Sequence, residues 1–299
     1  MNKALPIPIL IFILGLLLMG CSKKSTEIDW VYPDGNHKAL IMSYDDGLDD
    51  DIVLAQLFDR YGIIGTFHLN SGLLDTRAIW YQGKPNEFVG TYLSKDTLVH
   101  VFKNHEIAVH GTYHKALVGL SDEEILEEIN VDIENLSILS DRKISSMAYA
   151  FGSTNDHVAE VIGTTPLTNA RTVKPSYNFE LPKDYYLWNP TCHDSEALDY
   201  QEAYISLDSP SLSLFYVWGH SWELRDTLRN QNILKFCNEI GDRDDIWYTG
   251  AGDFADYHAS LKVLEIGPQQ IVNPEGNGIV YYREKGQLKS LNPGQRLIY

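Results

Sequence analysis

Residues 39–47 read ALIMSYDDG, an apolar run that ends in two adjacent aspartates and a glycine. The apolar part, Ala39–Met42, predicts a buried strand of the core. A strand interior does not tolerate two adjacent carboxylates, because an unpaired buried charge costs several kcal/mol. We therefore expect Asp45 and Asp46 at the mouth of the strand, beside a group that neutralises them.

Similar apolar runs recur along the chain and alternate with helical patterns. The expected strands are 39–44, 65–69, 106–110, 146–151, 170–173, 214–219 and 246–249. Helices are expected over 51–61 and 121–139, and the second opens with Ser121 and Glu124 in the positions of a capping box. This alternation indicates an α/β fold with a mostly parallel sheet covered by helices, and seven strands suit a barrel, complete or incomplete.

The pattern changes near residue 259. Beyond it, short strand-like runs are separated by turn dipeptides such as GP, NP and PG, without a helical pattern. We expect residues 259–299 to form a small β extension packed on a main domain at 35–258. A separate strand-only module is the alternative, but the segment is short for independent stability.

The N-terminus, MNKALPIPILIFILGLLLMGC, carries one early lysine and then an apolar stretch that ends at Cys21. This is the pattern of a secretory signal, because residues 4–20 fall short of the roughly 20 residues of a spanning helix. Residues 18–21 resemble the lipobox of bacterial lipoproteins, which implies cleavage before Cys21 and a lipid on its sulfur. We expect an exported protein of the bacterial cell envelope, attached to the membrane by a lipid anchor only; an uncleaved anchor helix is the alternative. The chain is divided accordingly into a signal peptide at 1–20 and a tether at 21–34.

The composition is acidic, with 41 Asp and Glu against 24 Lys and Arg, and a formal net charge of −17 at pH 7. Nucleic-acid binding depends largely on Lys and Arg at phosphates, so no nucleic-acid partner is expected. An uncharged or weakly charged ligand is favoured. Cys192 and Cys237 are compatible with a disulfide in an oxidising compartment or with two buried thiols. Nothing in the pattern indicates an oligomeric state.

Partners for the two aspartates occur in HEIAVHGTYH, residues 105–114. His110 and His114 are four residues apart, a spacing that can direct both imidazoles to one point. Two histidines and one carboxylate form a common catalytic zinc set that leaves a position open for water. A nearby dication also explains two adjacent carboxylates at neutral pH. The acidic run 45–51 lacks the ligand pattern of an EF-hand, and HExxH does not fit because the second histidine falls one residue late.

Four motifs in order resemble those of the polysaccharide deacetylases of carbohydrate esterase family four. The motifs are SYDDG at 43–47, HGTYH at 110–114, MAYAFG at 147–152 and FYVWGHSWE at 215–223. The resemblance covers roughly residues 38–255. It implies a distorted (β/α)7 barrel with the active site at the carboxyl ends of the strands.

The resemblance also implies roles for individual residues. The metal ligands would be Asp46, His110 and His114, holding one divalent ion, with zinc expected and cobalt, nickel or manganese as alternatives. Asp45 would be the general base, His220 the general acid, and the Phe151 backbone N–H would hold the oxyanion. The implied reaction is hydrolysis of O- or N-linked acetyl groups from an acetylated polysaccharide or oligosaccharide.

The third motif departs from the family pattern, because Ala148 and Tyr149 stand where an arginine and a proline are usual. Arg171, at the end of the next expected strand, is our hypothesis for the missing charge. In the second motif Gly111 replaces the usual Ser or Thr, which concerns the shape of the loop. The fourth motif, which supplies an aspartate beside the acidic histidine, has no clear match; His193 and Asp194 are candidates, and an exposed loop is the alternative.

The residues beside the expected acid have two interpretations. Trp218 and Trp222 flank His220 and, with Tyr149, are predicted to bind substrate, although both tryptophans also suit the core. A carbohydrate-binding lipoprotein with the fold but little catalysis, an unrelated metal hydrolase and a hydrolase of a non-acetyl amide stay open as functions. The complete set of expected catalytic and metal-binding residues favours the deacetylase.

Overall fold

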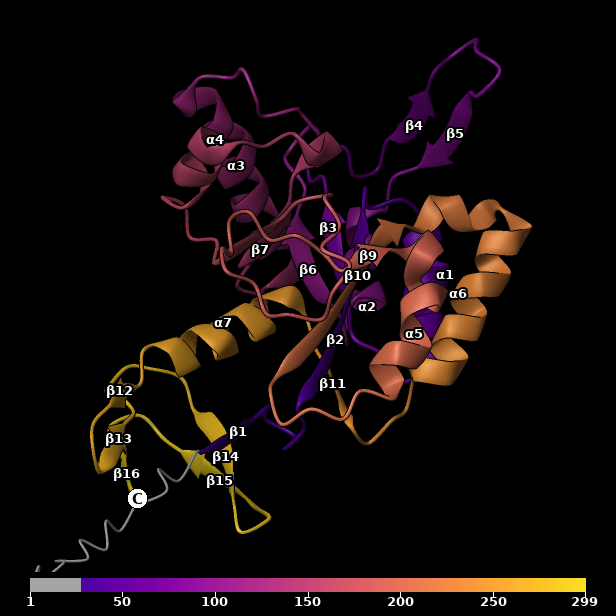
Figure 1. Ribbon diagram of the computed structural model, residues 1–299. Coiled ribbons are helices and arrows are strands. Elements are labelled where there is room, and N and C mark those ends of the chain that lie inside the picture. The colour runs from indigo at the N-terminus through magenta and orange to yellow at the C-terminus, as the bar shows by residue number, and fades with distance from the viewer. Residues whose placement is uncertain (1–27) are drawn as a thin grey trace, which may run out of the picture.

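The computed structural model describes residues 28–299, so the expected signal peptide and Cys21 lie outside the described residues. The centre of the fold is a parallel sheet (Figure 1). Its continuous path runs through β8 (Asn169–Arg171), β7 (Ser146–Ala148), β6 (Glu106–Val109), β3 (Gly65–Leu69), β2 (Lys38–Asp45), β10 (Ser213–His220) and β9 (Cys192–His193). Every neighbouring pair on this path is parallel. The predicted α/β fold is confirmed. All seven expected strands are present, six on this path and the seventh as β11 (Ile246–Tyr248) beside β2, although the strand expected at 146–151 ends at Ala148; β9 was not expected.

The sheet is a distorted barrel because β2 changes partner along its length. Its second half, Met42–Tyr44, pairs with β3, whereas its first half, Lys38–Leu40, pairs with β11 (Ile246–Tyr248). The irregular segment 185–191 hydrogen-bonds to β8, at one end of the sheet, and to β10, next to the other end. Trp188 exchanges backbone hydrogen bonds with the β8 side, and Thr191 N–H donates to the Tyr216 carbonyl in β10.

Helices cover the sheet: α1 (Asp50–Arg60), α2 (Lys95–Val101), α3 (Asp122–Ser140), α4 (Asp156–Ile162), α5 (Ala197–Ile205), α6 (Thr227–Ile240) and α7 (Ala251–Lys262). Both helices expected from the sequence are present. The Ser121 hydroxyl accepts from the Glu124 N–H, and the Glu124 carboxylate accepts from the Ser121 N–H, which completes the predicted capping box. Apolar side chains of α1, Leu54, Ala55 and Phe58, are buried against the sheet.

The C-terminal part forms two small antiparallel sheets, as expected for a β extension. One contains β1 (Asp29–Val31), β14 (Val280–Glu284) and β15 (Gln287–Leu291); the other contains β12 (Glu265–Ile266), β13 (Gln270–Val272) and β16 (Arg296–Ile298). Two details differ from the expectation. Helix α7 continues past residue 259 to Lys262. Part of the segment expected to be a tether instead forms β1, which pairs with β14.

The sequence did not predict the hairpin of β4 (Arg77–Trp80) and β5 (Phe88–Thr91), which projects from the main domain (Figure 1). Its strands are short, and their apolar positions alternate for too few residues to stand out. The turn-forming loop GKPNE between two aromatic residues is the signal that marks it. Across residues 28–299, no helix has the length and apolar character needed to cross a membrane.

Candidate metal-dependent active site

Parallel strands deliver polar side chains to one edge of the sheet, because their carboxyl ends lie together there. Asp45 ends β2, Arg171 ends β8, His220 ends β10, and His110 follows β6. Asp45 and His220 are partners in the β2–β10 register. These ends open into a cleft of about 830 Å³. Aromatic side chains line much of it: Trp80, Tyr81, Tyr92, Tyr113, Tyr149, Phe151, Trp218 and Trp222.

The three expected metal ligands converge on one point. Asp46 Oδ1 lies 3.6 Å from His110 Nε2 and 3.4 Å from His114 Nε2. All three ligand atoms lie within 4.8 Å of one another. Ligand atoms about 2.0–2.1 Å from a tetrahedral zinc are roughly 3.4 Å apart, so the spacing fits one divalent ion.

The protonation states of the two histidines suit metal binding. His110 Nδ1 lies 2.9 Å from the Ala148 carbonyl, which only accepts, so Nδ1 carries the proton and Nε2 keeps its lone pair. Burial lowers the pKa of both His110 and His114 to about 4. Both imidazoles are therefore neutral at pH 7, as metal binding requires.

The loop that carries these histidines is held by α3. The Glu128 carboxylate accepts from the Tyr113 N–H at 2.7 Å, and Asp132 accepts from the His110 N–H at 3.2 Å. Gly111 has φ +86°, and a Cβ there would lie 2.9 Å from Glu128 Oε1. The glycine in the second motif is thus required by the close approach of Glu128.

The second oxygen of Asp46 has its own partner. Trp222 Nε1–H donates to Asp46 Oδ2 at 2.8 Å. The sequence interpretation of Trp222 offered only a sugar-stacking surface or a core position, and did not foresee this contact. An indole N–H has no local pattern that shows which carboxylate it will reach.

Asp45 is paired with Arg171 inside the protein. Arg171 Nη2 lies 2.5 Å from both carboxylate oxygens of Asp45, and Arg171 Nε donates to Ser43 Oγ at 3.0 Å. The guanidinium also lies 4.8 Å from the centroid of the Trp218 ring. Burial raises the pKa of Asp45, but Arg171 and His110 outweigh it and hold that pKa well below its usual range. Arg171 therefore stands where the hypothesis for the missing third-motif charge requires it.

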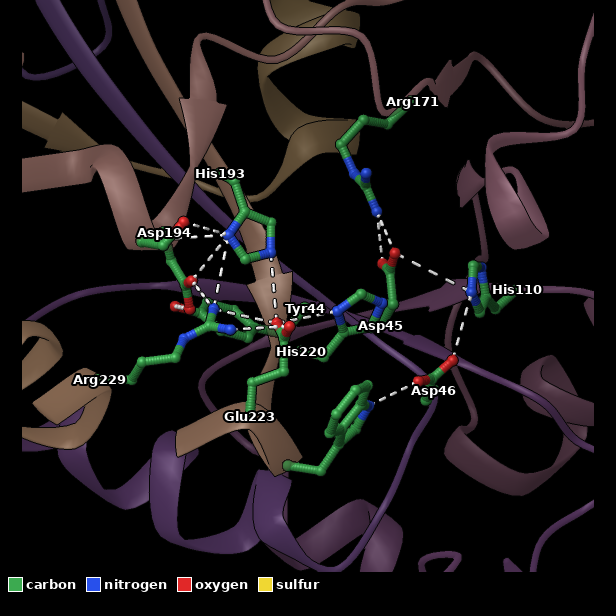
Figure 2. A network of polar contacts seen from close by, with 12 residues as sticks. Tyr44, Asp45, Asp46, His110, Arg171, His193, Asp194, His220, Glu223 and Arg229 are labelled. Atoms are coloured by element: carbon green, nitrogen blue, oxygen red, sulfur yellow. Dashed lines mark hydrogen bonds and ion pairs between the residues drawn. The ribbon is translucent and has the colours of Figure 1, made fainter. Parts of the chain in front are cut away.

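His220 belongs to a network of charges (Figure 2). Its Nδ1 lies 3.1 Å from Glu223 Oε2, and Arg229 Nη1 lies 2.7 Å from Glu223 Oε1. Burial lowers the pKa of His220, but the hydrogen bond to Glu223 and the charges of Asp46 and Asp45 raise it, with a net value of about 9. His220 is therefore protonated at neutral pH.

Glu223 was missed by the sequence interpretation, although its position three residues after His220 was a usable signal. Within the described residues, neither His193 nor Asp194 hydrogen-bonds His220 directly. His193 Nε2 lies 3.3 Å from Glu223, and Asp194 lies 2.5 Å from Arg229 Nη2. These polar contacts of the two fourth-motif candidates are therefore with Glu223 and Arg229, and not with His220 itself.

Other expected site residues lie on the walls of the cleft. Phe151 has φ +58°, its side chain is 71% exposed, and its ring centroid lies 4.4 Å from that of His114. Tyr149 is buried, and its hydroxyl donates to the Tyr186 carbonyl. Their roles toward a substrate stay predictions. Outside the cleft, Cys192 and Cys237 are both buried free thiols.

Residues 33–170 match the family described as polysaccharide deacetylase. Residues 33–170 of this chain are therefore similar in sequence to polysaccharide deacetylases. The match includes Asp45 and the three candidate metal ligands, Asp46, His110 and His114, but ends before Arg171. A search of curated proteins by sequence finds no match to this chain.

One of the similar solved structures has a TM-score above 0.5. A protein of Mycobacterium smegmatis described as a polysaccharide deacetylase is 15% identical, with a TM-score of 0.54, over 77% of this chain and 93% of that chain. A mutant of peptidoglycan deacetylase from Bacillus subtilis is also 15% identical, with a TM-score of 0.46, over 76% and 95%. A polysaccharide deacetylase from Bacillus cereus is 17% identical, with a TM-score of 0.38, over 45% of this chain and only 40% of that chain. At this identity the likeness of the Mycobacterium smegmatis structure concerns the fold alone.

Proposed function

We propose that this chain belongs to the polysaccharide deacetylase family and is a metal-dependent hydrolase that removes O- or N-linked acetyl groups from an uncharged polysaccharide or oligosaccharide. The observation that carries the proposal is the convergence of Asp46, His110 and His114 beside an ionised Asp45 and a protonated His220. A protein that only binds glycans has no need of this complete set.

A bound divalent ion, with zinc expected, would polarise the acetyl carbonyl and lower the pKa of water. Asp45, kept ionised by Arg171, accepts the proton of the attacking water. His220 donates its proton to the leaving oxygen or nitrogen, and Glu223 keeps that proton available. The Phe151 backbone N–H would hold the oxyanion, and acetate leaves without a covalent link to the protein.

The lining of the cleft supports an uncharged ligand. Among residues 28–299, no lysine or arginine lines it, and half of the lining residues are Trp, Tyr or Phe. Such walls suit the apolar faces of sugar rings better than an anionic polymer, because burying unpaired anions is costly. We extend the proposal to an exported lipoprotein of the bacterial cell envelope, anchored at Cys21, which rests on the N-terminal sequence alone.

Acetate release from a panel of glycans tests the proposal. The purified protein would be incubated with acetylated xylan, chitin oligomers and peptidoglycan, in zinc-loaded and chelated form. Asp45→Asn and the surface variant Asp96→Asn provide a matched pair. We expect acetate from one substrate class, lost on chelation and in Asp45→Asn and unchanged in Asp96→Asn.

The same experiment separates the alternatives. Bound zinc without acetate from any glycan would contradict deacetylation and favour either a non-acetyl amide substrate or a binding role. Acetate release that survives both chelation and Asp45→Asn would contradict the proposed mechanism. The substrate that responds also decides between O- and N-linked acetyl groups.

A further inference from the structure

The two oxygens of the Asp46 carboxylate have different environments. Oδ1 faces the ring nitrogens of His110 and His114, at 3.6 and 3.4 Å. Oδ2 accepts the hydrogen bond of the Trp222 indole at 2.8 Å. The carboxylate is almost completely buried. Rotating Oδ2 away from Trp222 would therefore leave both Oδ2 and the indole N–H without a hydrogen-bond partner.

The Trp222 ring is in turn held by hairpin β4–β5. Its centroid lies 5.4 Å from that of Trp80 and 5.3 Å from that of Phe88, and the last two rings stack on each other at 4.4 Å. Arg225, in the same short helix η3 (Ser221–Arg225), donates to the Val89 carbonyl, and its guanidinium lies 4.6 Å from the Phe88 ring. Two side chains of η3, Trp222 and Arg225, therefore contact the hairpin.

We propose that Trp222 is a positioning residue for the metal, supported by the aromatic side chains of hairpin β4–β5. Its indole N–H occupies Asp46 Oδ2 and presents Oδ1 alone as a ligand. A carboxylate that binds with one oxygen uses one coordination position, whereas binding with both oxygens uses two. With Oδ2 held in this way, Asp46 would take up one position on a bound ion and would leave another free for the substrate. This inference rests on the proposed function in one respect, the assignment of Asp46 as a metal ligand.

Metal-binding histidines are commonly oriented by a hydrogen bond from the ring nitrogen that does not bind the metal. The Trp222–Asp46 hydrogen bond would orient a metal-binding carboxylate in the same way. Such partners typically change metal affinity by about 10- to 100-fold when they are removed. The hairpin holds this contact in place, because an indole packed against two stacked aromatic rings loses little freedom on donating its N–H.

Metal affinity of the full-length protein tests the inference. Trp222→Phe keeps an aromatic ring beside Trp80 and Phe88 but removes the N–H. We expect its Kd for Zn²⁺, measured by competition with a chromophoric chelator, to rise about tenfold. The visible spectrum of the Co²⁺-loaded variant should also change, because a freed carboxylate alters the number of ligand oxygens. Trp30→Phe, the same substitution in β1 against Tyr282, should leave both readouts unchanged.

A measurement on the unmodified protein covers the case in which Trp222→Phe does not fold. The indole N–H resonance of Trp222 should shift on Zn²⁺ addition and stop shifting at one equivalent, while that of Trp30 stays constant. An unshifted Trp222 resonance, or an unchanged Kd and Co²⁺ spectrum in folded Trp222→Phe, overturns the inference. If Asp46→Asn weakens Zn²⁺ binding and Trp222→Phe does not, only this inference fails. If the unmodified protein binds no Zn²⁺, the proposed function fails with it.

Discussion

Arg171 and Asp45, 126 positions apart in the sequence, form an ion pair that water barely reaches. Their side chains are 0% and 3% exposed. The pair brings the last residue of β8 to the last residue of β2 across the barrel. It explains how a carboxylate expected to act as a base stays ionised beside a second carboxylate.

Breaking this pair should destabilise the protein. Arg171→Met at pH 7 leaves Asp45 buried without its counter-ion, so we expect the free energy of unfolding in urea to fall by about 3–5 kcal/mol. Arg171→Met combined with Asp45→Asn should lose less than Arg171→Met alone, because no charge is then stranded. A double variant as unstable as the sum of the two single variants would show that the pair is not coupled.

The pH dependence of acetate release should report Glu223. The pKa of His220 is raised from 6.5 to about 9, so its proton is present at neutral pH and lost as the pH rises through about 9. Glu223→Gln removes the negative charge beside His220 while burial still lowers the pKa of His220, and we expect the alkaline limb of activity to move to lower pH. The sign follows from linkage: a raised folded-state pKa stabilises the protein below 6.5, and this stabilisation is lost toward pH 9.

Nuclear magnetic resonance titration of the His220 ring in the same variant checks the cause directly. Glu202→Gln, on the exposed side of α5, is the control and should leave the His220 pKa in place. An alkaline limb that does not move in Glu223→Gln would assign the proton donor to another group.

Metal binding should stabilise the folded protein. Only the folded chain brings Asp46, His110 and His114 together, so Zn²⁺ at about 100 times its Kd should raise the free energy of unfolding by about 2.7 kcal/mol. His114→Ala should lose most of this increment, which differential scanning calorimetry with and without chelator would show. His157→Ala, an exposed histidine on α4, should keep it in full. An equal increment in both variants would place the metal elsewhere.

Substitutions at Gly111 and Gly83 would distinguish the cost of a positive φ from the cost of a steric clash. Both have positive φ, +86° and +74°, but a Cβ at Gly111 meets Glu128 at 2.9 Å, whereas a Cβ at Gly83 meets nothing within 4 Å. We expect Gly83→Ser to cost about 1 kcal/mol from φ alone and Gly111→Ser to cost about 2–3 kcal/mol, with weaker Zn²⁺ binding. Equal losses of unfolding free energy in urea would show that Glu128 moves away freely.

Tyr81 should contribute to substrate binding. It is 59% exposed on the wall of the cleft, and burying such a ring under a sugar is worth about 1.5 kcal/mol, or roughly tenfold in KM. Tyr81→Ala should therefore raise KM with little change in kcat or in Zn²⁺ affinity. Tyr177→Ala, which removes a ring 52% exposed outside the cleft, is the matched control. An unchanged KM in Tyr81→Ala would exclude the hairpin from the substrate site.

The sequence by itself determined most of the sheet and the capping box of α3, and the motifs in it pointed to the residues of the candidate metal set. Each depends on a local signal: an apolar run, a helical period, or polar residues directly after a strand. Parallel strands place their carboxyl ends at one edge, so residues such as Asp46 and His110 were predictable as neighbours before any distance was known.

Only the tertiary structure decided which side chains support that set. Arg171 was a hypothesis from its place at a strand end, and its contact with Asp45 depends on how far the barrel curves. Glu223 at His220 and Trp222 at Asp46 were not foreseen at all. Such contacts are set by rotamers and by the packing of separate segments, including hairpin β4–β5. A buried polar side chain must find a partner, but its own sequence neighbourhood does not say which one.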